Sequence, residues 1–369
     1  EGIESYLYPS AKLFRQQELG NWEPVFKEIK ENLLKLTNSE KFARTEQEML
    51  ADAHKLIDQK EYTKAEVLLK NAALLFPDSE EIFLLSGYLN QICGNLSEAL
   101  KSNLNVIKIN PSNHTAYSNM GVVLKDLKRF DEAEKSLSIA IKINDSNAIA
   151  YNNMAIISHL KGDFEKSRIY LEKALAINPL YHEAYINLSN YYDTTGDTTK
   201  ALESIEKAIE IAPQSADAHF NKSVILLKEG YNLEGWKEYE WRKKKAEYQK
   251  RNFSIPELIS TDVYGKTILV YDEQGYGDTI QFARYIEFLK HKGAKVILEC
   301  HKSLVRLLKI CKGITEVYSR GELNEKEFKI DYQTALLSLP LLLYKEISEI
   351  PANVPYLEAD ERQDLIWHE

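Results

Sequence analysis

The sequence repeats itself with a period of 34 residues, and this period limits the possible folds more than any other feature of the chain. Alignment of the chain with itself at this spacing gives two columns of small residues, a column of bulky residues and a column of prolines. The small columns contain Ala65, Ala99, Ala133, Ser167, Ala201 and Gly235, and then Ala72, Val106, Ala140, Ala174 and Ala208. The bulky column contains Met49, Phe83, Tyr117, Tyr151, Tyr185 and His219, and the prolines are Pro77, Pro111, Pro179 and Pro213, with Asp145 in that place once.

These columns predict two antiparallel α-helices in each unit. Small residues are needed where two helix backbones approach closely, and proline ends the second helix because it cannot donate the next backbone hydrogen bond. One helix pair cannot bury its own apolar face, so successive pairs are expected to stack into a right-handed superhelix with a concave groove. The period and its columns resemble tetratricopeptide repeats. We assign six repeats to residues 46–250 and a helical N-terminal cap to residues 1–45.

A column of asparagines runs through four of the repeats, two residues after the bulky position. It contains Asn119, Asn153, Asn187 and Asn221. Each side-chain amide offers a donor and an acceptor, so a row of them can hold the backbone of an extended peptide. A similar asparagine ladder lines the repeat groove of O-linked N-acetylglucosamine transferases, where it holds the protein substrate. Two interpretations stay open: a peptide-binding groove, or local hydrogen bonds from helix to helix.

The last repeat changes in character and leads out of the array. Trp236, Tyr239 and Trp241 are spaced to cover one helical face, and a basic run follows from Arg242 to Arg251. The run could attract phosphate, but we predict a solvated helix face beside an aromatic seal against the next domain. Residues 251–264 contain the proline, serine and glycine typical of a linker.

The remaining residues, 265–369, alternate between strand and helix patterns. "KTILVYD", "AKVILECH" and "ITEVYSR" predict strands, whereas "DTIQFARYIEFLKHKG" and "SLVRLLKICKG" predict helices. This alternation with short connections predicts a parallel, Rossmann-like α/β lobe after the all-α repeats. Ligands of such sheets bind beyond the carboxyl ends of the strands, which places Asp272 to Asp278 where chemistry is expected. The apolar stretch "ALLSLPLLLY" is expected to be partly exposed if a partner lobe is absent.

The glycine-containing motifs of this lobe allow three readings. "GKT" at Gly265 to Thr267 precedes a strand and lacks the upstream glycine of a phosphate-binding loop, so it predicts a turn. "GYGDTI" lacks the third glycine of a dinucleotide site. In the third reading, Gly275 and Gly277 let the backbone pass close to a ligand, and the following helix offers N–H groups to an anion or a sugar hydroxyl. Asp278 then either takes part in chemistry or only caps the helix.

The motifs "EQGYGDTIQFARY", "LLSLP" and "IPANVPYL" together resemble the N-terminal lobe of bacterial heptosyltransferase-like glycosyltransferases, which have two Rossmann lobes (the GT-B fold). Repeats followed by this lobe resemble bacterial repeat-containing glycosyltransferases. The resemblance implies that Asp278 takes the proton of an acceptor hydroxyl in an inverting, metal-independent sugar transfer. It assigns Glu273, Gln274, Gly275, Gly277, Gln281 and Arg284 to the acceptor loop.

The same resemblance implies that the nucleotide-sugar donor binds mainly to a second lobe. Residues 265–369 contain no second glycine-rich turn or assignable base pocket, so we expect no cofactor and no metal in this chain. The chain begins with Glu1 and stops about where a linker between two lobes would begin. It is therefore expected to be either a truncated enzyme or half an enzyme kept for another use.

Two functions of different classes follow. The leading hypothesis is a repeat-containing glycosyltransferase, or a fragment of one, whose groove binds a protein or peptide acceptor; the alternative is a non-catalytic scaffold for protein–protein interactions. A net charge of -9 disfavours nucleic-acid binding, and no apolar run approaches the roughly 18 residues of a membrane span. Cys93, Cys300 and Cys311 form no metal spacing and predict reduced thiols in a cytoplasmic protein. The oligomeric state stays open.

Overall fold

The computed structural model describes residues 22–29, 44–230, 232–245, 248, 251, 253–323, 328–344 and 356–357. The chain divides into two compact units, Glu1–Lys161 and Gly162–Glu369. Residues 23–29 are helical, and most of the predicted N-terminal cap lies outside the described residues. Of the motif "IPANVPYL", only Tyr356 and Leu357 lie within them.

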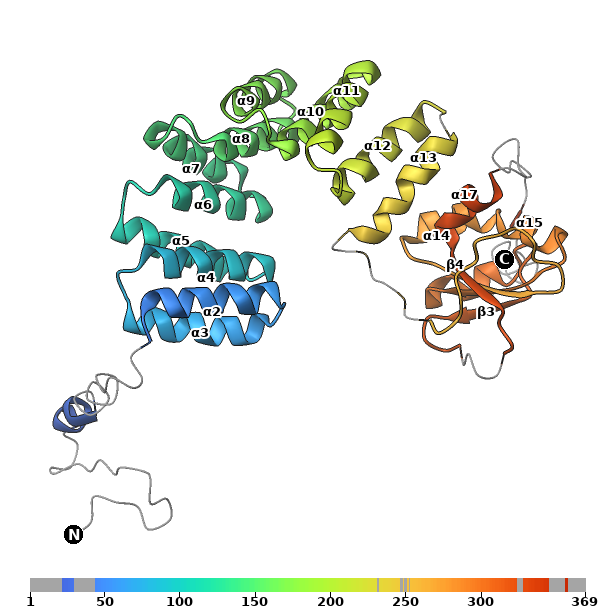
Figure 1. Cartoon of the computed structure of the whole chain (residues 1–369), viewed down its shortest axis with the longest axis horizontal. Coiled ribbons are helices and arrows are strands. Elements are labelled where there is room, and N and C mark those ends of the chain that lie inside the picture. The colour runs from blue at the N-terminus through green and yellow to red at the C-terminus, as the bar shows by residue number, and fades with distance from the viewer. Residues whose placement is uncertain are drawn as a thin grey trace, which may run out of the picture. The chain divides into compact units, whose positions relative to one another are not determined.

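The helices follow the 34-residue period. In the first unit they are α2 (Glu46–Asp58), α3 (Tyr62–Leu75), α4 (Glu80–Ile92), α5 (Leu96–Ile109), α6 (His114–Asp126), α7 (Phe130–Ile143) and α8 (Ala148–Leu160) (Figure 1). In the second unit they are α9 (Phe164–Ile177), α10 (His182–Thr195), α11 (Thr198–Ile211), α12 (Ala216–Lys228), α13 (Asn232–Tyr239) and the 3-10 turn η1 (Glu240–Lys244). The predicted helical repeats are confirmed.

The small columns lie where the helices approach most closely. Every member of the first column that precedes Gly235 is at most 2% exposed, and every member of the second is fully buried. Gly121 of α6 shows the same constraint at another position. A Cβ atom added there would lie 2.5 Å from the Cγ atom of Leu137 on α7, so glycine is what lets these two helices approach.

A second feature joins neighbouring repeats of the first unit through their N-caps. The side-chain oxygen of Asn113 caps α6 by accepting from the N–H of Ala116 at 2.8 Å, while its amide nitrogen donates to Glu80 of the preceding repeat at 2.6 Å. Ser79 repeats this arrangement with Glu46, and Asn147 repeats it with His114. Each cap therefore stabilises its own helix and also binds the start of the first helix one repeat earlier.

Substitutions at Asn113 should separate these two roles. Asn113→Ala removes both and should lower the free energy of unfolding by about 1–2 kcal/mol. Asn113→Asp keeps a good cap but places a carboxylate beside Glu80, so it should also destabilise. Addition of Glu80→Gln to Asn113→Asp should restore most of the lost free energy of unfolding. Urea unfolding followed by circular dichroism measures all of these variants. If Asn113→Asp is as stable as the wild type with Glu80 present, the contact between repeats is unimportant.

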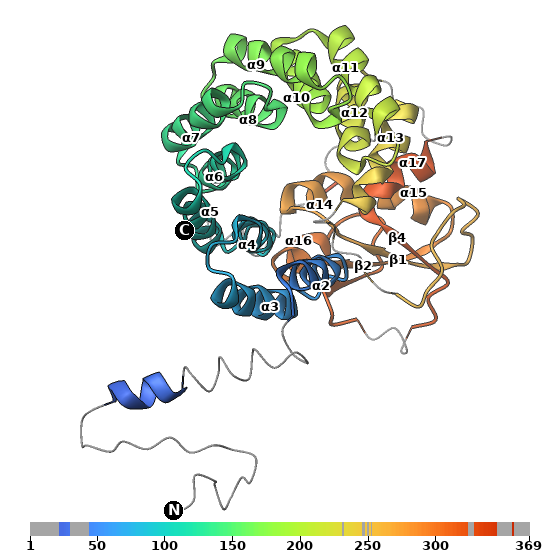
Figure 2. The same cartoon turned by 60° about the vertical axis from the view of Figure 1, so that its left-hand side comes forward.

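The C-terminal part of the second unit contains a four-stranded parallel sheet. The strands are β1 (Thr267–Tyr271), β2 (Lys295–Cys300), β3 (Glu316–Ser319) and β4 (Tyr332–Ala335), in the order β3-β2-β1-β4 (Figure 2). The helices between and after them are α14 (Tyr276–Ala283), α15 (Ile286–His291), η2 (Lys302–Leu304), α16 (Val305–Leu308), η3 (Leu336–Ser338) and α17 (Leu339–Leu343). The predicted parallel sheet is present, and β4 is a strand that the sequence did not reveal.

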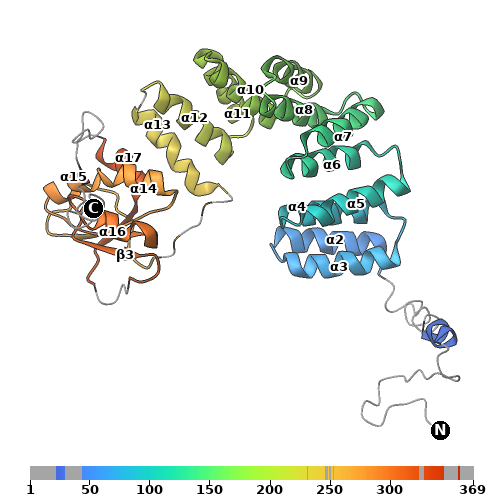
Figure 3. The same cartoon turned by 180° about the vertical axis from the view of Figure 1, so that it is seen from behind.

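The core of this part includes most of the apolar stretch that was predicted to be partly exposed. Leu336, Leu337, Leu339 and Leu343 of "ALLSLPLLLY" are almost fully buried in it, whereas Leu341 and Leu342 are half-buried and Tyr344 is 37% exposed. The partial exposure predicted for this stretch is therefore limited to its last residues. The reason is that η3 and α17 pack back onto their own sheet, and α17 also contacts α13 (Figure 3). Gly265 has a φ of 70°, which fits the turn predicted for "GKT".

Within the part of the chain that is described, no helix combines the length and the apolar character needed to cross a membrane. The three cysteines are free thiols, with Cys93 exposed and the other two buried. Burial raises the pKa of the Cys300 thiol to about 12 and that of Cys311 to about 11, so both stay protonated at neutral pH.

Candidate functional site

The polar residues of the sheet collect at its carboxyl edge. Asp272 and Glu273 follow β1, His301 follows β2 and Arg320 follows β3. From β1 the chain continues to β2 and β3 on one side of β1, whereas the last strand, β4, pairs with β1 on the opposite side. The strand order therefore reverses beside β1. In parallel sheets a crevice opens at the carboxyl ends beside such a reversal, and ligands bind there. This edge is therefore the candidate site.

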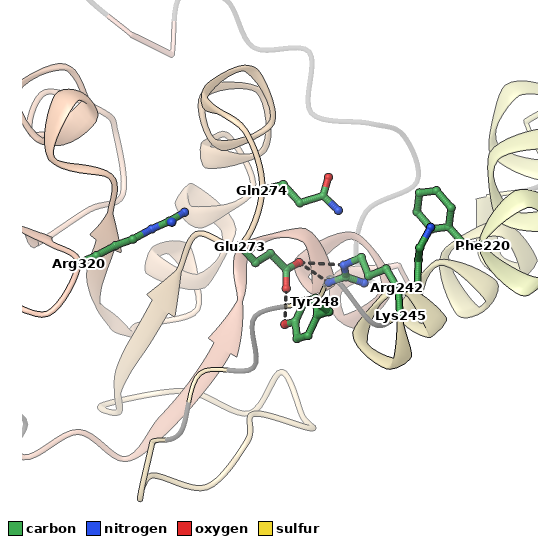
Figure 4. A pocket seen from close by; sticks show the side chains of 7 residues that line it. All are labelled: Phe220, Arg242, Lys245, Tyr248, Glu273, Gln274 and Arg320. Carbon is green, nitrogen blue, oxygen red and sulfur yellow. Dashed lines mark hydrogen bonds and ion pairs between the residues drawn. The ribbon is translucent and has the colours of Figure 1, made fainter. Parts of the chain in front are cut away.

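A buried arginine from the end of the repeats enters this edge. Arg242 of η1 is only 2% exposed and the side chain of Glu273 only 1%. The arginine Nε and Nη2 atoms donate to one Glu273 oxygen at 2.9 and 2.5 Å, and the Tyr248 hydroxyl donates to the other at 2.7 Å (Figure 4). Arg242 also donates to Glu240 and to Ser338, at 2.7 and 2.9 Å. Both oxygens of Glu273 are thus occupied.

The basic run that begins at Arg242 was predicted to be a solvated helix face, and for Arg242 this is wrong. Glu273 at the carboxyl edge and Glu240 of η1 itself compensate its charge, and the Ser338 hydroxyl accepts a further hydrogen bond, which is what allows Arg242 to be buried. The predicted aromatic seal is present in part: Trp236 meets Phe282 of α14 edge-on at 5.8 Å, whereas Trp241 stacks on His219 of α12 at 3.7 Å. Burial, followed by the nearby Glu273 carboxylate, also raises the pKa of the Tyr248 hydroxyl.

Loss of Arg242 should destabilise the second unit strongly. Arg242→Ala leaves the buried Glu273 carboxylate without its cation, which should lower the free energy of unfolding by about 3–5 kcal/mol. The double variant Arg242→Met/Glu273→Leu removes both charges and should regain most of that loss. Urea unfolding followed by tryptophan fluorescence measures both. A loss below about 1 kcal/mol for Arg242→Ala, as found for exposed ion pairs, would contradict a buried pair.

The predicted acceptor loop is only partly available for a ligand. Glu273 is occupied as described, and Gln274 accepts from the Tyr239 hydroxyl at 3.4 Å through Oε1. Gly275 is the N-cap of α14, so the alternative in which Asp278 caps the helix is wrong. Asp278 is the third residue of α14, half-buried, and its carboxylate has no hydrogen-bond partner among the described residues. Gly277 is exposed, and a Cβ atom there would meet no atom within 4 Å.

The last two loop residues lie at the other end of α14. Gln281 is exposed. Arg284 donates from Nε to the carbonyl of Gln281 at 2.8 Å, and its guanidinium lies over the Tyr356 ring at 4.6 Å. These contacts fit the surface role that the sequence left open for Arg284, and they place it a full helix length from Gly275.

A cavity of about 380 Å³ opens at the edge beside the buried arginine (Figure 4). Its walls come from the repeat side and the sheet side of the same unit. They are formed by Phe220, Arg242, Lys245 and Tyr248, and by Glu273, Gln274 and Arg320. The resemblance singled out only Glu273 and Gln274. The remaining residues could not be found from sequence spacing, because they lie far from the glycine turn along the chain.

The asparagine column divides into different environments. Asn153 is 7% exposed and donates to the Ile149 carbonyl of its own helix at 2.9 Å. Asn221 donates to the Asn190 side chain on α10 at 3.1 Å, a bond from one helix to another. Asn187 is half-buried and has a contact of its own. Asn119 is half-buried, and its amide has no hydrogen-bond partner among the described residues. Local bonding therefore accounts for Asn153 and Asn221 but not for Asn119.

No group of three or more His, Cys, Asp or Glu side chains in the described residues is arranged to hold a metal ion.

Comparison with known proteins identifies the type of repeat. The tetratricopeptide repeat family matches residues 112–179 and 146–214. A tetratricopeptide repeat protein from Parabacteroides merdae is similar, with 16% identity, a TM-score of 0.50 and coverage of 61% of this chain and 87% of that one. The APC/C hetero-tetramer Cut9-Hcn1 has 12% identity and a TM-score of 0.51, and the match covers 59% of this chain and 43% of that one. None of the curated proteins matches the chain.

This chain therefore carries tetratricopeptide repeats. At identities this low, the structural likeness shows the fold alone. The comparisons support a repeat protein, and they give no support to a fused glycosyltransferase.

Proposed function

We propose that this protein binds a partner protein or peptide through the first helices of its repeats, which is the scaffold function. The observation that carries the proposal is the tetratricopeptide repeat itself, matched over residues 112–214. Stacked repeats leave one face of each first helix without a neighbour, and such faces bind peptides.

The exposed residues of the first helices fit this use. Tyr88 and Ile92 on α4 are 51% and 41% exposed, and Ile149 and Leu160 on α8 are 54% and 57% exposed. These apolar side chains contribute little to the core of the repeats and can bury apolar area against a partner. The Asn119 amide on α6 adds a donor and an acceptor for the backbone of a peptide.

Peptides selected from a random display library against the whole chain provide the test. Asn119→Ala should weaken the selected peptides by roughly three- to tenfold, the effect of one net hydrogen bond. Asn71→Ala removes an exposed amide from the second helix α3 and should leave their affinity unchanged. Fluorescence anisotropy measures both. Failure to select any binding peptide, or equal losses for the two variants, would argue against the proposed face.

A second candidate function is sugar transfer, as the resemblance to heptosyltransferase-like enzymes implies. The observation that favours it is Asp278, a half-buried carboxylate without a protein partner among the described residues, at the carboxyl edge of a parallel sheet. Both oxygens of Glu273, the neighbouring carboxylate in the loop, already accept hydrogen bonds, from Arg242 and Tyr248. Asp278 is thus the better placed of the two for a general base.

Transfer to protein acceptors should depend on Asp278 if this second function holds. In the complete gene product supplied with nucleotide sugars, Asp278→Ala should lower the rate by about 10²–10⁴-fold, the usual contribution of a general base. Asp262→Asn, an exposed acid of the same unit, is the matched control and should have little effect. Sugar transfer that survives Asp278→Ala would exclude the catalytic role.

A further inference from the structure

We propose that the cavity at the carboxyl edge binds a small molecule with an oxyanion group, a phosphate ester or a carboxylate, through Arg320 and Gln274. This function is separate from partner binding by the repeats and does not use Asp278, which does not line the cavity. The cavity volume of about 380 Å³ lies within the range of small-molecule sites, about 300–1,000 Å³.

The charge of the cavity wall favours an anion. Arg242, Lys245 and Arg320 are cations, and Glu273 is the one carboxylate among the residues that line the cavity. Both oxygens of that carboxylate are already used by Arg242 and Tyr248. Arg242 is compensated by Glu273 and Glu240, and Lys245 pairs with Asp217 at 2.9 Å. The positive group that the wall presents to a ligand is therefore the guanidinium of Arg320, which is paired with Asp272 through Nε.

Arg320 is held in position for such a ligand. Its Nε atom donates to Asp272 at 2.6 Å, and Asp272 is itself 1% exposed. The second Asp272 oxygen accepts from the backbone N–H of His301 at 2.8 Å. This carboxylate fixes the guanidinium while using only its Nε donor. The two Nη groups have no hydrogen-bond partner among the described residues, and a pair of Nη donors matches an oxyanion in a bidentate manner.

Gln274 and Phe220 complete the site. Gln274 uses its oxygen to accept from Tyr239, so its Nε2 group remains a donor, without a partner among the described residues. Figure 4 shows Arg320 extending toward Gln274 from one side of the cavity, with Phe220 on the other. The Phe220 ring gives an apolar wall for the uncharged part of a ligand.

The test is a thermal-shift titration of the whole chain with inorganic phosphate and with succinate, at ionic strength held constant with sodium chloride. A ligand that binds the folded state raises Tm in a saturable way. We expect a saturable rise with at least one probe; phosphate alone would assign a phosphate ester and succinate alone a carboxylate. Absence of a saturable rise with both would overturn the proposal.

Variants decide whether the effect comes from this cavity. Arg320→Gln should raise the half-saturating concentration of the binding probe, phosphate or succinate, at least tenfold. Gln274→Glu leaves the pair of Arg320 and Asp272 intact but adds a negative charge, and it should raise that concentration by at least the same factor. Arg306→Gln removes an exposed arginine outside the cavity lining and should respond as the wild type does. Asn119→Ala should also respond as the wild type, which separates this site from the proposed peptide face. An unchanged response of both Arg320→Gln and Gln274→Glu would overturn the proposal.

Discussion

The buried ion pair of Arg242 and Glu273 is the interaction on which the second unit depends. A guanidinium and a carboxylate that are both nearly inaccessible to water must keep their partners, because either one alone would be a buried, uncompensated charge. These hydrogen bonds hold the 3-10 turn after the last repeat against the carboxyl edge of the sheet. Apolar contacts between Trp236 and Phe282 add area to this contact, whereas the charges determine its geometry.

This pair also decides which residues of the carboxyl edge are free to act. It uses the oxygens of Glu273, whereas the Asp278 carboxylate, the Gln274 Nε2 group and the Nη groups of Arg320 have no hydrogen-bond partner among the described residues. The carboxyl edge therefore contains two separate candidate sites. One is the Asp278 carboxylate on α14, the general base that sugar transfer would need, and the other is the cavity beside it, which is lined by hydrogen-bond donors. The Asp278 site rests on the resemblance to heptosyltransferase-like enzymes, whereas the cavity rests on the geometry of its residues. Each site can exist without the other.

The repeats follow a simpler constraint, which is local. Helix pairs pack closely because small residues recur every 34 positions, and in the first unit the N-cap side chains tie each repeat to the one before it. The asparagine column illustrates that one sequence position can have several uses. Asn153 bonds within its own helix and Asn221 bonds to a neighbouring helix, whereas the Asn119 amide has no hydrogen-bond partner among the described residues.

The helical repeats, their close-packed columns and the first three strands could be predicted from the sequence, because periodicity and short apolar runs are local properties. The Gly-Asp turn was likewise visible as a motif. Tertiary structure alone decided that β4 pairs beside β1, that Gly275 and not Asp278 caps α14, and that Arg242 is buried. Arg242 bonds to Glu273, 31 residues away, and to Ser338, 96 residues away. Contacts over such distances leave no spacing in the sequence, because they arise only when packing brings separate elements together and burial makes an unpaired charge too costly to keep.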